Sequence, residues 1–288
     1  MRIKITADST CDLSPEQVRD NQITLFPLHV SMGGKDYRDG VDLTTAEIFE
    51  HVAKGGALCS TSAVSVGEYT ERFEQLSREF DAVIHVSLGS GFSAAYQNAC
   101  IASENLPNVY VVDSRNLSTG HGHVVMQACI WSHEMDDPEA VCARLRELTP
   151  RVETSFLLDR LDYMVKGGRC STVTALGANL LKLKPCIEVI DGKMQVVKKY
   201  RGSYERCMEN YVRERLEGRS DIIYDRIFIT RTTATPEIDR IVRDGVEKYG
   251  QFKEIVPTYA GCTVACHCGP ATLGILYIRK PDGNRTEA

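Results

Sequence analysis

The chain has 288 residues, which is long enough for one large domain or two ordinary ones with sizeable cores. Its 34 basic and 39 acidic side chains give a net charge of −5, and this balance shows no basic excess for nucleic-acid binding. No run of about 18 apolar residues predicts a transmembrane helix. The first residues also lack the apolar segment of a secretory leader, so we expect a cytoplasmic protein.

Short apolar runs alternate with helical patterns in the first half of the chain. Strands are predicted at 2–8, 81–90 and 108–116, an extended segment at 23–32 with a turn at 33–40, helices at 14–21, 44–56, 93–106 and 120–135, and a loop entering a helix at 60–80. This alternation predicts a three-layer α/β/α domain with a mostly parallel sheet. Ligands of such sheets bind beyond the carboxyl ends of the strands, so we expect the site in the loops that follow them.

The second half has a different pattern. A glycine-punctuated helical segment at 161–185 is followed by a hairpin at 186–202, helices at 203–218 and 235–250, a strand at 225–231 and final strands up to 280. Asp191 and Gly192 suit the tight turn of the hairpin. We therefore expect two α/β domains, residues 1–153 and a smaller one with a mixed sheet at 154–280, and a disordered tail at 281–288.

Two loops of the first half are rich in hydroxyl groups. Thr61, Ser62 and Ser65 lie where a loop enters a helix, and Ser93 follows the glycine-rich stretch at 87–92. Such residues commonly cap helices, but the free N–H groups of a helix start also bind anions and carboxylates. Neither loop matches the dinucleotide, P-loop or hydrolase-elbow patterns, so those three functions have no support.

Near its C-terminus the chain reads AGCTVACHCGPATLGI, residues 260–275, in which Cys262, Cys266 and Cys268 surround His267. If this stretch is a strand, His267 faces away from the adjacent thiols, so they cannot converge on one metal ion. A thiol nucleophile would also lack a base aimed at it. We therefore expect the 11 cysteines to be free thiols and no metal to be bound. From spacing alone, His267 is either a structural residue or a ligand-binding one.

Basic side chains gather in two segments of the second half, and they are Lys166, Arg169, Lys198, Lys199 and Arg201. They form either a solvated face or a docking surface for an acidic partner or a phosphate. We expect Arg169 and Arg201 to serve a partner rather than a ligand.

Seven short motifs follow one another along the chain: ADSTCDL, TSAVS, SGFSAAYQNA, VVDSRNLSTGHG, GGRCS, a hairpin ending in YRG, and HCGPATLGI. Together they resemble the DegV family of bacterial fatty-acid-binding proteins, over nearly the whole chain. The chain departs from the family pattern at Ala63 and Val64, where the family has glutamine and proline, and at Ala271, where it has glycine. These departures lie near the expected head-group site.

The resemblance implies two α/β domains with a long-chain fatty acid held in a tunnel between them. It implies that Thr61, Ser93 and His267 bind the carboxylate. The residues expected to support the site are Ser62, Gly91, Phe92 and Gly269. It also implies a non-catalytic protein without a cofactor that presents the acid to a separate fatty acid kinase subunit, which makes an acyl phosphate. A transient contact with a membrane is compatible with such a ligand.

Two other functions stay open at this stage. The family is similar to the substrate-binding subunit of dihydroxyacetone kinase, which suggests an enzyme or a kinase substrate subunit that handles a small carbonyl compound through His267. The cysteines alone suggest a structural metalloprotein. A small polar substrate needs no apolar tunnel, so the nature of the pocket distinguishes the first alternative from a fatty-acid carrier.

Overall fold

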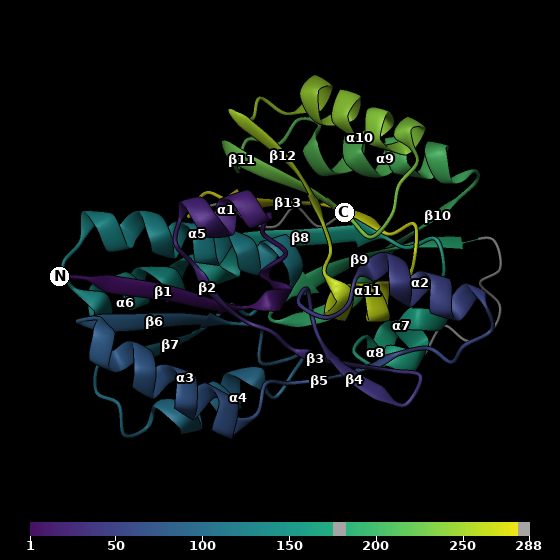
Figure 1. The fold of residues 1–288 in the computed structure, drawn as a ribbon. Helices are drawn as coiled ribbons and strands as arrows, with labels where there is room; N and C mark the ends of the chain where they lie inside the picture. The colour runs from purple at the N-terminus through teal and green to yellow at the C-terminus, as the bar shows by residue number, and fades with distance from the viewer. Residues whose placement is uncertain (175–182, 282–288) are drawn as a thin grey trace.

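The computed structural model describes residues 1–174 and 183–281, and it contains three β-sheets with helices packed around them (Figure 1). The mixed α/β fold expected from the sequence is confirmed. The helical pattern expected at 161–185 falls partly, and the expected tail falls almost entirely, outside the described residues. Among the residues that are described, no helix has the length and apolar content needed to cross a membrane.

The first sheet is parallel throughout and has the strand order β2-β1-β6-β7. Its strands are β1 (Ile3–Asp8), β2 (Thr24–Phe26), β6 (Ala82–Ser87) and β7 (Val109–Asp113). The helices of this part are α1 (Pro15–Asp20), α3 (Val66–Glu79), α4 (Ala95–Ser103), α5 (Ser118–Glu134) and α6 (Pro138–Leu148). Side chains of α3 and α4 form one core with this sheet and those of α5 and α6 form another, which gives the expected three layers.

The helix α5 lies between the first sheet and a second, mixed sheet, and it contacts strands of both. The second sheet has the order β10-β9-β8-β13-β11-β12, in which only β11 and β12 are parallel neighbours. Its strands are β8 (Val152–Leu157), β9 (Leu183–Ile190), β10 (Lys193–Arg201), β11 (Ile222–Arg231), β12 (Glu254–Tyr259) and β13 (Leu273–Arg279). The helices α9 (Tyr204–Leu216) and α10 (Pro236–Tyr249) pack on it through a separate core.

A small third sheet, of order β4-β3-β5, connects the two larger parts. It consists of β3 (His29–Met32), β4 (Lys35–Arg38) and β5 (Ser60–Ser62). Its buried side chains form one cluster with residues of α2 (Thr45–Ala53) and of α11 (Cys262–Cys268). A helix from the C-terminal end of the chain therefore packs on elements from the first 62 residues.

Four short elements complete the described chain, and they are η1 (Ser9–Cys11), η2 (Thr149–Arg151), α7 (Asp162–Gly167) and α8 (Ser171–Thr174). The hairpin turn at Asp191 and Gly192 is confirmed, since their φ angles are 50° and 73°. The expected boundary at residues 153 and 154 falls inside β8.

Two expectations about the secondary structure of the site are wrong. Residues 262–268 form a helix rather than a strand. Residues 60–62 form a strand, β5, rather than part of a loop. In each case a short segment takes its structure from neighbours that are distant in the sequence: β5 pairs with β3, and α11 packs on α2 and the small sheet.

Candidate functional site

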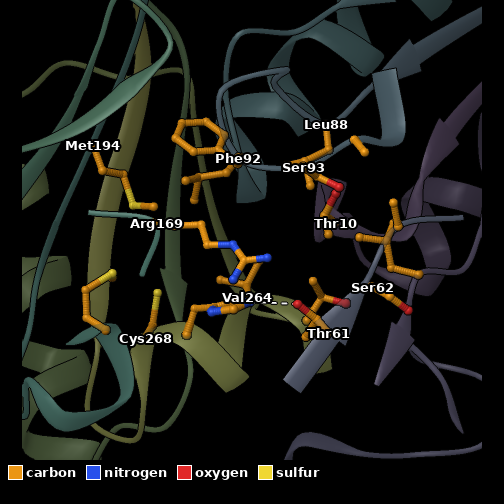
Figure 2. A pocket seen from close by; sticks show the side chains of 17 residues that line it. Thr10, Thr61, Ser62, Leu88, Phe92, Ser93, Arg169, Met194, Val264 and Cys268 are labelled. Carbon is orange, nitrogen blue, oxygen red and sulfur yellow. Dashed lines mark hydrogen bonds between the residues drawn. The ribbon is translucent and has the colours of Figure 1, made fainter. Parts of the chain in front are cut away.

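A pocket of about 210 Å³ lies where loops of the first sheet meet β5, α7, α11 and the hairpin β9–β10 (Figure 2). Its polar side chains are Thr10, Thr61, Ser62, Ser93, Arg169, Thr263 and His267. Its larger apolar side chains are Leu28, Leu88, Phe92, Leu117, Met164, Met194 and Val264. The pocket thus combines hydroxyl groups and one cation with an apolar wall, which suits an amphipathic ligand with a polar head.

Thr61 and His267, which are 206 positions apart in the sequence, form a hydrogen bond in the pocket. Their Oγ1 and Nε2 atoms are 2.8 Å apart. The strand β5 positions Thr61 through its pairing with Val30 of β3, and α11 carries His267 near its C-terminal end. The structure therefore brings together two of the three side chains that were predicted to bind a carboxylate.

Burial, together with the positive charge of Arg169, lowers the pKa of His267 to about 4. The imidazole is therefore neutral at pH 7. Its Nδ1 is buried without a hydrogen-bond partner among the described residues. Since a buried unpaired N–H group is rarer than an unpaired acceptor, the geometry favours the tautomer whose proton is on Nε2 and is donated to Thr61.

Ser93 lies in the loop between β6 and α4 and lines the same pocket. Its Oγ accepts a hydrogen bond from the N–H of Ala95, the first residue of α4, at 3.2 Å, while it remains at the pocket surface. Phe92 turns its ring toward the apolar wall, near Met194 of the hairpin (Figure 2). This loop therefore contributes one polar and one apolar group.

Two glycines that were predicted to support the site have backbone reasons to be glycine. A Cβ on Gly91 would lie 2.2 Å from the carbonyl oxygen of Gly192, at the turn of the hairpin. Gly269 ends α11 with a φ of 75°, and a Cβ there would lie 2.7 Å from Cδ2 of Tyr163. Ser62, the supporting residue with a polar side chain, lines the pocket directly.

Arg169 lines the pocket, whereas the sequence suggested a role in docking a partner. It follows Gly168, whose φ of 68° ends α7, and it donates a hydrogen bond to the carbonyl oxygen of Gly167 at 2.6 Å. Figure 2 shows its guanidinium group reaching into the space between Thr61 and Ser93. Arg201, in contrast, is exposed at the end of β10 and is not among the pocket-lining residues.

The cysteines around His267 belong to apolar clusters. Because α11 is a helix, Cys262 and Cys266 share one face and pack against the small sheet, while Cys268 packs in the core under the pocket. Burial raises the pKa of Cys262 and of Cys268 to about 12 and raises that of Cys266 further, so the thiols are protonated. Within residues 1–174 and 183–281, no three histidine, cysteine or acidic side chains are arranged to hold a metal ion.

Several residues that line the pocket were not among the site residues predicted from the sequence. Thr10 lies in η1, Leu28 precedes β3, and Met164 and Met194 come from α7 and the hairpin. Apolar residues with these spacings are typical of any core, so only the fold could identify them as a pocket wall.

Comparisons with known proteins agree with this geometry. The DegV family model, described as an uncharacterised protein family, matches residues 2–280. A DegV domain-containing protein of Caldanaerobacter subterraneus is 29% identical over 283 residues, which cover 97% of this chain and 99% of the relative.

Solved structures with the same fold carry descriptions that name a ligand. A DegV family protein from Thermus thermophilus, whose structure is described by its fatty acid binding, has a TM-score of 0.88 at 27% identity and covers 97% of this chain and 100% of its own. A protein from Eubacterium ventriosum described as binding stearic acid has a TM-score of 0.80 at 26% identity, over 97% of this chain and 99% of its own. Because the family model spans nearly all of its length, the chain belongs to the DegV family.

Proposed function

We propose that this protein binds one long-chain fatty acid, with the carboxylate at Thr61, Ser93 and His267 and the acyl chain along the apolar wall. The observation that carries the proposal is the hydrogen bond between Thr61 and His267 beside that wall. The descriptions of the Thermus and Eubacterium proteins support the class of ligand.

The chemistry of the polar end suits a carboxylate better than it suits catalysis. With Nε2 of His267 donating to Thr61, the Thr61 hydroxyl proton is free to be donated to a ligand oxygen. Ser93 offers a second hydroxyl, and Arg169 offers a charge-assisted hydrogen bond. A neutral imidazole beside protonated thiols supplies no activated nucleophile. The protein would therefore hold its ligand rather than transform it.

The acyl chain gains free energy from burial, at about 0.8 kcal/mol per CH₂ group. Leu88, Phe92, Leu117 and Met194 form the wall that would cover it. A bound acid would thus be hidden from water except near its head group. In keeping with the family resemblance, we assign the next step to a separate kinase subunit in the cytoplasm, which would form an acyl phosphate on the presented carboxylate. The exposed Arg201 of this protein would lie on the surface to which the kinase docks.

The first experiment is denaturation of the purified protein followed by mass spectrometry of the extracted lipid. About one long-chain fatty acid per chain is expected. Extracts without lipid, together with no rise in Tm on addition of palmitate or oleate, would contradict the proposal.

Affinity measurements on single variants test the head-group residues. Thr61→Ala, Ser93→Ala and His267→Ala should each weaken palmitate binding by roughly tenfold to a hundredfold, because each removes a hydrogen bond to the carboxylate or to its donor. Ser77→Ala in α3 and His133→Ala in α5, which do not line the pocket, are matched controls and should bind like the parent. Equal affinities in all five variants would place the head group elsewhere.

A further inference from the structure

Two buried carboxylates of the first half of the chain bind the backbone at the start of α11. Oδ1 of Asp12 accepts a hydrogen bond from the N–H of Gly261 at 2.9 Å, and Oδ1 of Asp39 accepts one from the N–H of Cys262 at 2.7 Å. The two carboxylates are 6% and 3% exposed. The helix that carries His267 is thereby fixed to residues 249 and 223 positions away in the sequence.

The carboxylates converge on Gly261. A Cβ at that position would lie 3.1 Å from Oδ1 of Asp12 and 3.1 Å from Oδ1 of Asp39. A side chain on Gly261 would therefore press against both oxygens, and the close approach of backbone and carboxylates depends on glycine at this position.

The second oxygen of each carboxylate reaches another segment of the pocket wall. Oδ2 of Asp12 accepts a hydrogen bond from Oγ of Ser118 at 2.5 Å, and Ser118 follows the pocket residue Leu117. Oδ2 of Asp39 accepts one from Oγ of Ser9 at 2.9 Å, and Ser9 precedes the pocket residue Thr10. Neither aspartate lines the pocket itself.

We propose that Asp12 and Asp39 are positioning residues for the carboxylate site, because they set the place of His267 relative to Thr61. His267 is five residues after Cys262, about 7.5 Å along a helix axis, in a helix of only seven residues. Such a short helix moves as one piece, so a shift at its start displaces the imidazole. This inference rests on the proposed binding of a fatty acid.

The test compares a head-group effect with a general loss of binding. Asp12→Ala and Asp39→Ala should weaken palmitate binding by about tenfold, since the displaced imidazole no longer orients Thr61, which donates a hydrogen bond to the charged carboxylate. Binding of hexadecanol, which has the same chain and no carboxylate, should stay within about twofold of the parent. Asp12→Asn and Asp39→Asn keep an oxygen acceptor for the N–H groups and should bind palmitate within about threefold of the parent. Both ligands are measured by displacement of a fluorescent fatty acid.

A double-mutant cycle asks whether the aspartates act through His267. In the His267→Ala background, Asp12→Ala should cause no further loss of palmitate affinity. An equal loss in both backgrounds, or an equal loss for palmitate and hexadecanol, would show a merely structural role and overturn the inference. Palmitate binding by Asp12→Ala and Asp39→Ala at the parent's affinity would also overturn it.

Folding and the proposed function are checked separately. If Asp12→Ala does not fold, Ser118→Ala and Ser9→Ala each remove one hydrogen bond from a carboxylate without changing the charge, and about a threefold loss confined to palmitate is expected. The absence of that loss would refute the positioning role. A parent protein that binds no palmitate would contradict the proposed function and this inference together, whereas tight parental binding with unaffected variants would contradict only the inference.

Discussion

Gly167 packs directly against the imidazole of His267, so that a Cβ on Gly167 would lie 2.3 Å from Nδ1. This nitrogen is the one that has no hydrogen-bond partner among the described residues, while Nε2 is bound to Thr61. The end of α7 therefore limits how far the imidazole can retreat from Thr61. A residue with no side chain thus helps to define the polar end of the pocket.

Gly167→Ala should displace the imidazole and weaken palmitate binding by roughly tenfold, because the hydrogen bond between Nε2 and Thr61 cannot keep its 2.8 Å length. The affinity is measured by calorimetry. Gly67→Ala in α3 is the control, since a Cβ there would meet only Oγ of Ser65, at an ordinary contact distance of 4.0 Å, and should leave binding unchanged. An affinity for Gly167→Ala equal to that of the control would mean that the imidazole does not contribute to the head-group site.

Gly91→Ala should push the hairpin turn away from the loop that carries Ser93, because the new Cβ would collide with the carbonyl oxygen of Gly192. Phe92 and Met194 would then separate, and the apolar wall would open. We expect faster release of the fatty acid, by about tenfold, with a smaller change in the association rate. Stopped-flow measurements of both rates are the check, and an unchanged release rate would show that this contact does not close the pocket.

The alternation of strands and helices in the first half could be predicted because apolar periodicity there follows local geometry. The helix α11 could not. Its sequence, CTVACHC, has seven residues with β-branched side chains among them, and so short a helix has little stability of its own. Contacts from Asp12 and Asp39 stabilise its start, and no local pattern announces them. Sequence resemblance, rather than periodicity, identified Thr61, Ser93 and His267 as candidates.

The position of Arg169 could not be predicted from the sequence either. A cation after a pair of glycines is typical of a solvated surface, and the sequence therefore suggested a docking role. Only the left-handed turn at Gly168 and the packing of α7 beside α11 direct the guanidinium group toward the pocket.

The two arginines should therefore respond differently to charge reversal. Arg169→Glu should lose most palmitate affinity, by more than about tenfold, since a carboxylate would then face the ligand's carboxylate. Arg201→Glu should bind palmitate like the parent, because Arg201 is exposed outside the pocket. Equal palmitate affinities in the two variants would mean that Arg169 does not contribute to ligand binding. The docking role of Arg201 is tested by phosphorylation of the bound acid by a cognate kinase. Among the variants that bind palmitate normally, a reduced rate in Arg201→Glu alone would support that role.

The buried histidines and the buried Asp12 change the free energy of unfolding in opposite directions as the pH changes. Burial lowers the pKa values of His121, His123 and His267 to about 4 each. Because the unfolded chain takes up protons at these residues near pH 6.5 and the folded chain does not, the free energy of unfolding falls as the pH drops from about 6.5 to 4. Acid should therefore unfold the protein cooperatively in this range, as measured by circular dichroism.

Asp12 has the reverse effect, since burial raises its pKa to about 8 with a further contribution from the charge of Asp39, which faces it across Gly261. The other titratable groups coupled to it, Cys11 and Cys268, are thiols whose pKa values burial raises to about 12, so they stay neutral in this range. The folded chain holds a proton that the unfolded chain releases near pH 4. Asp12 therefore does not lower the free energy of unfolding below about pH 4. Between about pH 4 and pH 8 it lowers this free energy by about 1.4 kcal/mol per pH unit.

The two effects together predict a maximum of stability near pH 7, where the unfolded chain has released most of its histidine protons and Asp12 has not yet lowered the free energy of unfolding by its full amount. Between pH 6.5 and 8, Asp12 lowers the free energy of unfolding by about 1.5 kcal/mol, while the last histidine protons released by the unfolded chain raise it by about 1 kcal/mol. Asp12→Asn, which cannot ionise, should therefore turn the slight decline in that interval into a rise. Urea unfolding at pH 6.5, 7.25 and 8 measures it: the parent should change by less than about 1 kcal/mol across the interval, whereas Asp12→Asn should gain about 1 kcal/mol. Asp113→Asn is a control outside this cluster, because Asp113 lies at the end of β7, where it binds the N–H of Ser90, and the pH profile of this variant should follow that of the parent. Parallel pH profiles for the parent and Asp12→Asn would mean that the Asp12 carboxylate is already ionised at pH 6.5, with Gly261 and Ser118 stabilising its charge.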